Sequence, residues 1–421
     1  MYKGITKKIG SNLTNASVST FLLANAFVWY LSAFKFLQDI ASSEGFDGNS
    51  LLFMIALNFL TFAFSAFLGI SLINHFKKRI TLLKYWMLAG LFLSSLFAII
   101  NLANFASVML LAGVLGAYFG LGMPTFAGFF AASTEQKNRA KFGGTIVLLI
   151  VLAFPTVTLV GISDTYLTSS ILAIWLALGL IFLTYFKPAE KKAEQKNRVS
   201  YRSVLSNKTF LLYIIPWLMF SLVNDLAMQI IATYFRINFP PYFSENYLII
   251  ENILAGGCAL ACGFLADKKG RKRLALIGFA LLGIGYASLG LFSRDYFAAW
   301  FYVCADGVAW GAFTMLFITT LWGDIAQEKN SEKYYVLGVL PYLCSTFANL
   351  SIGTYISNNV SVSTVFSFAS FFLFVAILPL VYAPETLSEK IIKNLELNNY
   401  VNSALEKVRK DNAKVRKTDK K

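Results

Sequence analysis

Long apolar runs constrain the fold of this chain of 421 residues more than any other feature. About 20 consecutive apolar residues span a bilayer as one α-helix. Lipid offers no partner to a free backbone amide, so every such run must be helical. We expect twelve spans, at 17–38, 51–74, 82–103, 106–132, 142–162, 166–186, 209–235, 245–266, 274–293, 296–322, 334–357 and 361–383.

The composition excludes a soluble protein. The chain is 57% hydrophobic and 14% charged, against about 25% charged in an average soluble domain, and its mean hydropathy is +0.61. The first run lacks a small-residue cleavage site and is followed by further runs. It is therefore interpreted as a first transmembrane helix and not as a removed signal peptide.

The basic residues predict the sidedness of the chain. When the loops are assigned to alternate sides, 34 of the 37 Lys and Arg residues fall on the side of both termini. Arg236 and Arg294 lie on the other side, and Lys35 lies near the outer end of the first span. The positive-inside rule then predicts cytoplasmic termini. The net charge of +15 indicates contact with anionic lipid headgroups. Nucleic-acid binding is a poor interpretation, because the cations are scattered over seven segments.

The chain divides into two similar halves. We expect bundles at 1–186 and 209–384, a cytoplasmic linker at 187–208, and a tail at 385–421. An offset of 194 residues places Gly69 on Gly263, and the basic cluster 77–79 on 271–273. The same offset also aligns Arg139 with Lys333 and Gly144 with Gly338. The pattern of the tail predicts a basic amphipathic helix on the membrane surface. Its apolar residues at helical spacing are Ile391, Ile392, Leu395, Val401, Leu405 and Val408.

A short basic loop between the eighth and ninth spans resembles a known family signature. It contains Gly263, Asp267, Gly270, Arg271, Lys272 and Arg273. This pattern is similar to the Gly-x-x-x-Asp-x-x-Gly-Arg-Lys/Arg loop of the major facilitator superfamily of secondary transporters. Glu135 and Arg139 after the fourth span, and Pro384-Glu385-Thr386 after the last, also resemble that family. The resemblance covers residues 17 to about 387.

The resemblance implies a fold and a gate. The fold class is an all-α membrane protein, with twelve transmembrane helices in two pseudo-symmetric six-helix bundles around a central cavity. The family's loop aspartate pairs with nearby cations or with a helix N-terminus, and so latches the cytoplasmic side. The first-half copy has Ile73 at the aspartate position and Phe76 at the turn glycine. We therefore expect an asymmetric latch in which Asp267 acts alone. Pro155 lacks the flanking glycines typical of drug antiporters in the fifth helix.

Two acids near the middle of spans are candidates for function, because a charge at the bilayer centre is costly. Asp225 lies in the seventh span and Asp306 in the tenth. The resemblance places both helices around the cavity, so both acids are expected to face one pocket. We hypothesise that one of them carries a proton or contacts a polar substrate. The alternative is a hydrogen bond between helices away from the cavity.

Further polar residues complete the predicted substrate and proton site: Asn224, Gln229, Asn25, Trp29 and Lys35. The first helix lines the cavity in the family, and Asn25 and Trp29 share one of its faces. Lys35 could neutralise an anionic substrate, pair with an acid, or extend to the outer headgroups. Glu251 lies in the outer third of the eighth span, where a peripheral role is expected.

Together these features predict secondary active transport of a small solute by alternating access, coupled to protons or to another ion. The alternatives are an uncoupled facilitator, and a membrane sensor or interaction protein that has kept the fold without flux. The chain has one histidine, His75, and no paired catalytic constellation, so we expect no enzyme, catalytic residue, cofactor or metal. A monomer in the plasma membrane is expected.

Overall fold

The computed structural model describes residues 2–76, 78–100, 102–161, 164–189, 200–326, 331–388, 391–393, 397 and 400–401. Within these residues the chain is helical and contains no strand. The first half comprises six helices: α1 (Tyr2–Ser43), α2 (Gly48–Phe76), α3 (Arg79–Ile99), α4 (Phe105–Ser133), α5 (Arg139–Gly161) and α6 (Thr165–Phe186).

The second half contains six longer spans and several short pieces. Its elements are α7 (Tyr201–Leu205), α8 (Lys208–Asn238), α9 (Pro241–Ser244), α10 (Tyr247–Lys269), α11 (Arg271–Leu291), α12 (Tyr296–Phe313), η1 (Thr314–Thr320), α13 (Leu321–Ala326), α14 (Ser331–Ala348), η2 (Asn349–Gly353), α15 (Thr354–Asn359) and α16 (Val362–Tyr382). The π-helical segments η1 and η2 continue the helices that precede them.

The twelve predicted spans are confirmed, because twelve described helices are long and apolar enough to cross a membrane. The tenth span runs through α12, η1 and α13, from Tyr296 to Ala326. The predicted linker contains α7, and residues 190–199 lie outside the described part. The predicted tail helix also lies largely outside it. The chain is thus a multi-pass integral membrane protein.

Side-chain caps start several of the helices. Asn207 accepts hydrogen bonds from the amides of Thr209 and Phe210 at the start of α8. Asp295 begins α12 and Ser361 begins α16 in the same way. These side chains satisfy amides that have no partner within the helix. The loops are short, so each cap fixes where a span leaves the membrane surface.

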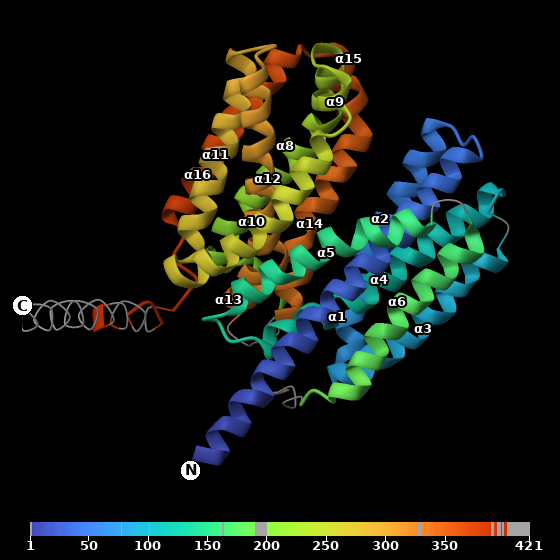
Figure 1. Ribbon diagram of the computed structural model, residues 1–421, viewed down its shortest axis with the longest axis vertical. Coiled ribbons are helices and arrows are strands. Elements are labelled where there is room, and N and C mark those ends of the chain that lie inside the picture. Colours follow the sequence, from blue (N-terminus) through green and yellow to red (C-terminus); the bar gives the residue numbers. More distant parts are fainter. Residues whose placement is uncertain are drawn as a thin grey trace, which may run out of the picture.

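The helices form two bundles, α1–α6 and α8–α16 (Figure 1). Aromatic side chains fill both. In the first, Trp86 stacks on Tyr118 with ring centroids 4.2 Å apart, and Trp29 meets Tyr118 edge-on at 5.0 Å. In the second, Trp217 stacks on Phe317 at 5.0 Å. Such pairs contribute specific packing in addition to their apolar area.

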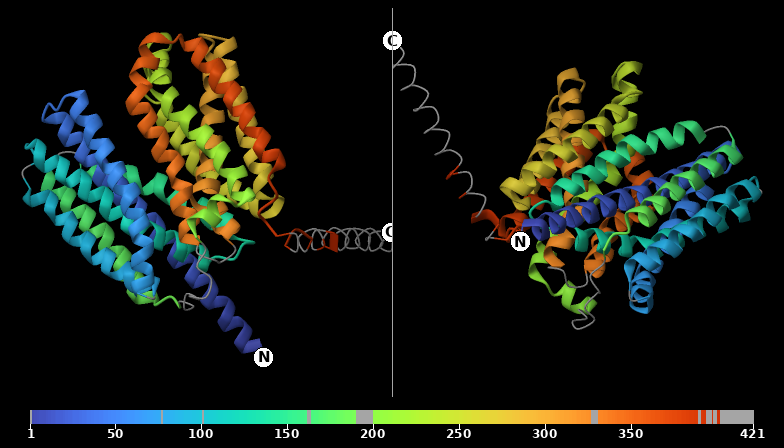
Figure 2. Two further views of the ribbon diagram at one scale, coloured as in Figure 1. Left: turned by 180° about the vertical axis from the view of Figure 1, so that it is seen from behind. Right: turned by 60° about the horizontal axis from the view of Figure 1, so that its bottom comes forward.

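Because the number of spans is even, α1 starts and α16 ends on the same side of the molecule, which we call the terminal face. The bundles approach each other at this face and diverge towards the opposite face (Figures 1 and 2). Close contact between α5 and α10 depends on glycine. A Cβ atom on Gly144 would lie 2.3 Å from the carbonyl oxygen of Ala259, and one on Gly263 would lie 2.4 Å from that of Ala140.

Candidate functional site

The terminal face is closed by a buried network of charges around Asp324, at the end of the tenth span. Its carboxylate accepts from Arg139 Nη1 at 2.5 Å and from Arg271 Nε at 2.9 Å. Arg139 begins α5 in the first bundle, whereas Asp324 and Arg271 belong to the second. All three side chains are at most 5% exposed. One buried carboxylate therefore joins the two bundles.

Arg271 and Asp267 extend this network. The Arg271 guanidinium donates to Asp267 at 2.8 Å, and to the carbonyl oxygen of Gln136 in the first bundle at 2.5 Å. Asp267 accepts from the amides of Ala140 at 3.2 Å and Lys141 at 2.8 Å. These amides lie at the N-terminus of α5, where the helix dipole favours a negative charge. Asp267 thus contacts both a cation and a helix N-terminus, the two kinds of partner that the family resemblance implied.

Glu385 caps α11 from the chain segment after α16. Its two carboxylate oxygens accept from the amides of Arg271 at 2.9 Å and Lys272 at 3.1 Å. Gly270 makes this approach possible, because its φ is +98° and a Cβ there would lie 2.3 Å from Glu385. Lys272 also donates to the carbonyl oxygen of Val381 at 2.7 Å.

A second ion pair joins the bundles where the first-half loop lacks its acid. Arg79 at the start of α3 contacts Glu332 in the first turn of α14 at 2.6 Å. The two side chains are 12% and 6% exposed. Glu332 fits against Gly128, where a Cβ would lie 2.4 Å from its Oε1. The first-half loop, which lacks its own acid, therefore forms an ion pair whose acid is supplied by α14.

The remaining predicted gate residues lie at the surface. Glu135 pairs with Lys137, and both side chains are more than half exposed. Arg273 is exposed. Sequence position alone could not show that Glu135 and Arg273 face solvent while the nearby Arg139 and Arg271 face the other bundle.

A polar cluster surrounds Asp225 between α8, α12 and α14. Its carboxylate accepts from Ser345 at 2.6 Å, from Thr346 at 3.1 Å and from Asn224 at 3.2 Å. Asn224 also accepts from Trp310 Nε1 at 3.1 Å. The side chains of Asn224, Asp225 and Trp310 are half-buried. We call these five residues the Asp225 cluster.

Tyrosine side chains border this cluster on the side of the first bundle. Tyr342 of α14 lies within electrostatic reach of both Asp225 and Tyr30 of α1. Tyr30 donates to Asn58 at 2.5 Å, and Asn58 in turn donates to the carbonyl oxygen of Ala112 at 2.8 Å. Tyr342 is 36% exposed. The cluster therefore faces the other bundle through a surface of neutral polar and aromatic groups.

Asp306 lies in a different helix seam, inside the second bundle. It is 4% exposed. Tyr302 donates to it at 3.1 Å, and it hydrogen bonds with Glu251 of α10. A Cβ on the adjacent Gly307 would lie 2.8 Å from the Cβ of Leu254, so α10 and α12 are in close contact here. Two carboxyl groups in contact away from water cannot both carry a charge, so this pair holds a proton.

The structure corrects the expectation that Asp225 and Asp306 face one pocket. Asp225 turns towards α14, whereas Asp306 turns towards α10. Asn25 and Trp29 are also not part of a shared site, because both are 0% exposed within the first bundle. Asn25 donates to the carbonyl oxygen of Trp175 at 2.7 Å, and Trp29 donates to Ser94 at 2.9 Å. Both lie on the α1 face that packs against α3 and α6.

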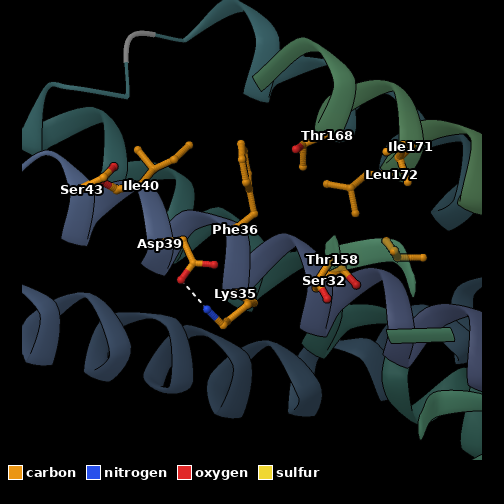
Figure 3. Close-up of a pocket in the computed structure, with 11 residues that line it drawn as sticks. Ser32, Lys35, Phe36, Asp39, Ile40, Ser43, Thr158, Thr168, Ile171 and Leu172 are labelled. Carbon is orange, nitrogen blue, oxygen red and sulfur yellow. Dashed lines mark hydrogen bonds and ion pairs between the residues drawn. The ribbon is translucent and has the colours of Figure 1, made fainter. Parts of the chain in front are cut away.

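Lys35 borders a pocket within the first bundle. The pocket has a volume of about 120 Å³ and lies between α1, α5 and α6. Lys35 pairs with Asp39 on α1, while Phe36 lies on the side where Thr168 and Leu172 of α6 are found (Figure 3). This pocket is separate from the Asp225 cluster. Gln229 is exposed one helical turn beyond Asp225.

Several residues of these sites were missed in the sequence. Asp324 and Glu332 lie near the ends of spans, where an acid is usually solvated, and Glu385 was noted only as part of a family motif. Glu251 was expected to be peripheral. Its contact with Asp306 could not be predicted from sequence spacing, because the two residues belong to different spans.

Comparisons with known proteins agree with this architecture. The model of the Major Facilitator Superfamily matches residues 17–303 and 248–413. The chain is similar in structure to the proton:xylose symporter XylE, with 14% identity over 92% of this chain and 99% of that chain and a TM-score of 0.66. It is also similar to a bacterial homologue of the iron transporter ferroportin in an outward-facing state, with 10% identity, coverage of 88% and 98%, and a TM-score of 0.66. No curated protein matches the chain.

Proposed function

The chain belongs to the Major Facilitator Superfamily, and on this basis we propose that it is a secondary active transporter that moves a small solute by alternating access, coupled to protons. The chain acts as a monomer. The terminal face, which carries most basic residues, lies in the cytoplasm of the cell whose plasma membrane holds the protein. The opposite face is then the open one.

One observation carries the proposal: at the terminal face, buried ion pairs cross between the bundles beside the packing of α5 on α10. Arg139–Asp324 and Arg79–Glu332 cross between the bundles. The packing of α5 on α10 continues some way from this face. Gly256 still meets Val151, whereas the neighbouring Leu152 and Ile253 are 60% and 64% exposed. Ion pairs lose most of their desolvation cost when water enters, so such a closure can open and reform.

The solute binds at the Asp225 cluster, and the proton is carried by the Asp306–Glu251 pair. The cluster faces the other bundle, as alternating access requires of a solute site. The carboxyl pair lies between α10 and α12, and α10 packs directly on α5 of the other bundle. Movement of the bundles therefore changes the surroundings of the pair, which gives a physical route from proton release to opening.

Reconstitution tests this proposal. Purified protein is placed in proteoliposomes that contain a pH-sensitive dye, and uptake is measured for labelled xylose, 2-phenylethylamine and phenylacetate as neutral, cationic and anionic solutes. We expect one class to move together with protons. In Asp306→Asn and Glu251→Gln we expect proton movement to be lost while solute exchange at equal concentrations continues. Glu44→Gln, an exposed loop residue, is the matched control.

Each other outcome has a defined meaning. Solute flux without proton movement, unchanged in both carboxyl variants, would contradict coupling and identify a facilitator. Solute binding without flux would contradict transport and identify a sensor. The absence of both binding and flux for all three solute classes would also contradict the proposal.

A further inference from the structure

The Asp225 cluster contains a carboxyl group that, among the described residues, has no cationic partner. Its three hydrogen-bond donors are neutral side chains: Ser345, Thr346 and Asn224. An ionised carboxylate away from water is costly unless a counter-charge is supplied. The hydroxyl and amide donors position the carboxylate but do not neutralise it.

The surroundings of Asp225 suit a cation and oppose an anion. Trp310 comes from α12, with its indole N–H fixed on Asn224 and its ring edge-on to Phe220 at 5.2 Å. Tyr342 is close to the carboxylate and partly exposed. The ammonium of Lys35 is already paired with Asp39. The groups that face the carboxylate are therefore aromatic, hydroxyl or amide groups.

Aromatic rings near a carboxylate form a recognisable type of site. Cations are attracted to the faces of Trp and Tyr rings, by about 0.5–2 kcal/mol per ring. An organic cation with an apolar body can use the rings and the carboxylate together. A divalent metal ion fits this site less well, because Ca²⁺ takes six to eight oxygen ligands and the described residues contain no group of three His, Cys, Asp or Glu side chains that could hold a metal ion.

We propose that the Asp225 cluster binds a monovalent organic cation, with Asp225 as its counter-ion and the rings of Trp310 and Tyr342 as its walls. This inference rests on the proposed solute site and names its substrate class. It differs from a site for a neutral sugar, which needs no uncompensated charge. Asp225 is a binding residue here, while Ser345 and Asn224 position its carboxylate.

Equilibrium binding to the full-length chain in detergent tests the inference without requiring flux. Calorimetry compares 2-phenylethylamine with 2-phenylethanol and phenylacetate, which have similar size and differ in charge. We expect the amine to bind at least tenfold more tightly than the other two. In Asp225→Asn we expect its affinity to fall at least tenfold, to that of the alcohol, whereas Asp225→Glu retains the preference for the cation.

Further variants separate charge from packing. Trp310→Leu should weaken amine binding several-fold, and Trp310→Phe, which keeps a ring, should weaken it less. Glu44→Gln should leave it unchanged. Thermal unfolding of each variant with and without amine shows whether it is folded. Equal binding of amine and alcohol, unchanged affinity in Asp225→Asn, binding of xylose or Mn²⁺ in place of amine, or no amine binding would each overturn the inference.

The failure of this inference and that of the proposed function are distinguishable. Amine binding that depends on Asp225 without flux in proteoliposomes would uphold the site and contradict transport. Proton-coupled flux of xylose that survives in Asp225→Asn would uphold transport and contradict the cation site.

Discussion

The Arg79–Glu332 pair predicts how readily the terminal face opens. Glu332→Gln removes the negative charge and keeps an acceptor of similar shape. The pair is almost buried, and both the Nε and Nη2 atoms of Arg79 contact the same carboxylate oxygen, at 2.7 and 2.6 Å. Replacing a charged acceptor by a neutral one at such a site costs about 1.5–3 kcal/mol. This pair joins the two bundles only when the terminal face is closed, so the substitution raises the free energy of the closed state relative to the open state.

At 1.4 kcal/mol per factor of ten, the loss shifts the equilibrium between closed and open terminal faces by roughly 10- to 150-fold. Spin labels at positions 137 and 273, in a chain whose four cysteines are replaced, report the separation of the bundles by electron–electron double resonance. Both positions are exposed and belong to different bundles. We expect a longer-distance population in Glu332→Gln that is minor in the parent chain.

A charge swap supplies the control for this measurement. Arg79→Glu alone should open the face as Glu332→Gln does, because two acids then meet. Combining Arg79→Glu with Glu332→Arg should restore the short distance at least in part. A distance distribution that Glu332→Gln leaves unchanged would refute the reasoning, since the pair would then contribute nothing to closure.

Three other predictions concern packing and capping. Gly263→Val should open the terminal face in the same distance measurement, because its Cβ would lie 2.4 Å from the carbonyl oxygen of Ala140; an unchanged distance would contradict the close crossing. Glu385→Ala should lower the free energy of unfolding by about 0.5–2 kcal/mol through the lost cap of α11, measured by denaturant titration, whereas Glu135→Ala, a surface control, should not. Trp29→Phe should lower the free energy of unfolding by about 1–3 kcal/mol, because the hydrogen bond to Ser94 is lost. It should leave the affinity for the amine unchanged; a changed affinity would indicate that Trp29 takes part in binding.

The family loop is the part of the site that sequence patterns described best. The signature residues lie within nine positions of the chain. Gly263 allows the close helix crossing, Asp267 caps α5, Gly270 forms the turn and Arg271 is the buried cation. The acids within the spans were recognised as costly and hence as functional candidates. Their arrangement was not predicted correctly. Asp225 and Asp306 were assigned to one site, whereas their side chains lie in different seams between helices.

Pairing between spans depends on how each helix is rotated and which neighbour it meets. The spans are apolar around most of their circumference, so hydrophobic periodicity does not orient them. For this reason the partnerships of Asp324 with two arginines, of Glu332 with Arg79 and of Glu251 with Asp306 emerged only in the folded molecule. Asn25 and Trp29 share a face of α1, as their spacing predicts, but that face turns into its own bundle.

The sequence alone therefore determined the number of spans and their division into two halves, because lipid requires a helix wherever an apolar run is long enough. It also predicted which side carries the basic loops. Only the tertiary structure decided which charges meet. An ion pair needs two side chains within a few ångströms, and here those side chains come from helices separated by up to 253 residues, brought together by the packing of one bundle against the other.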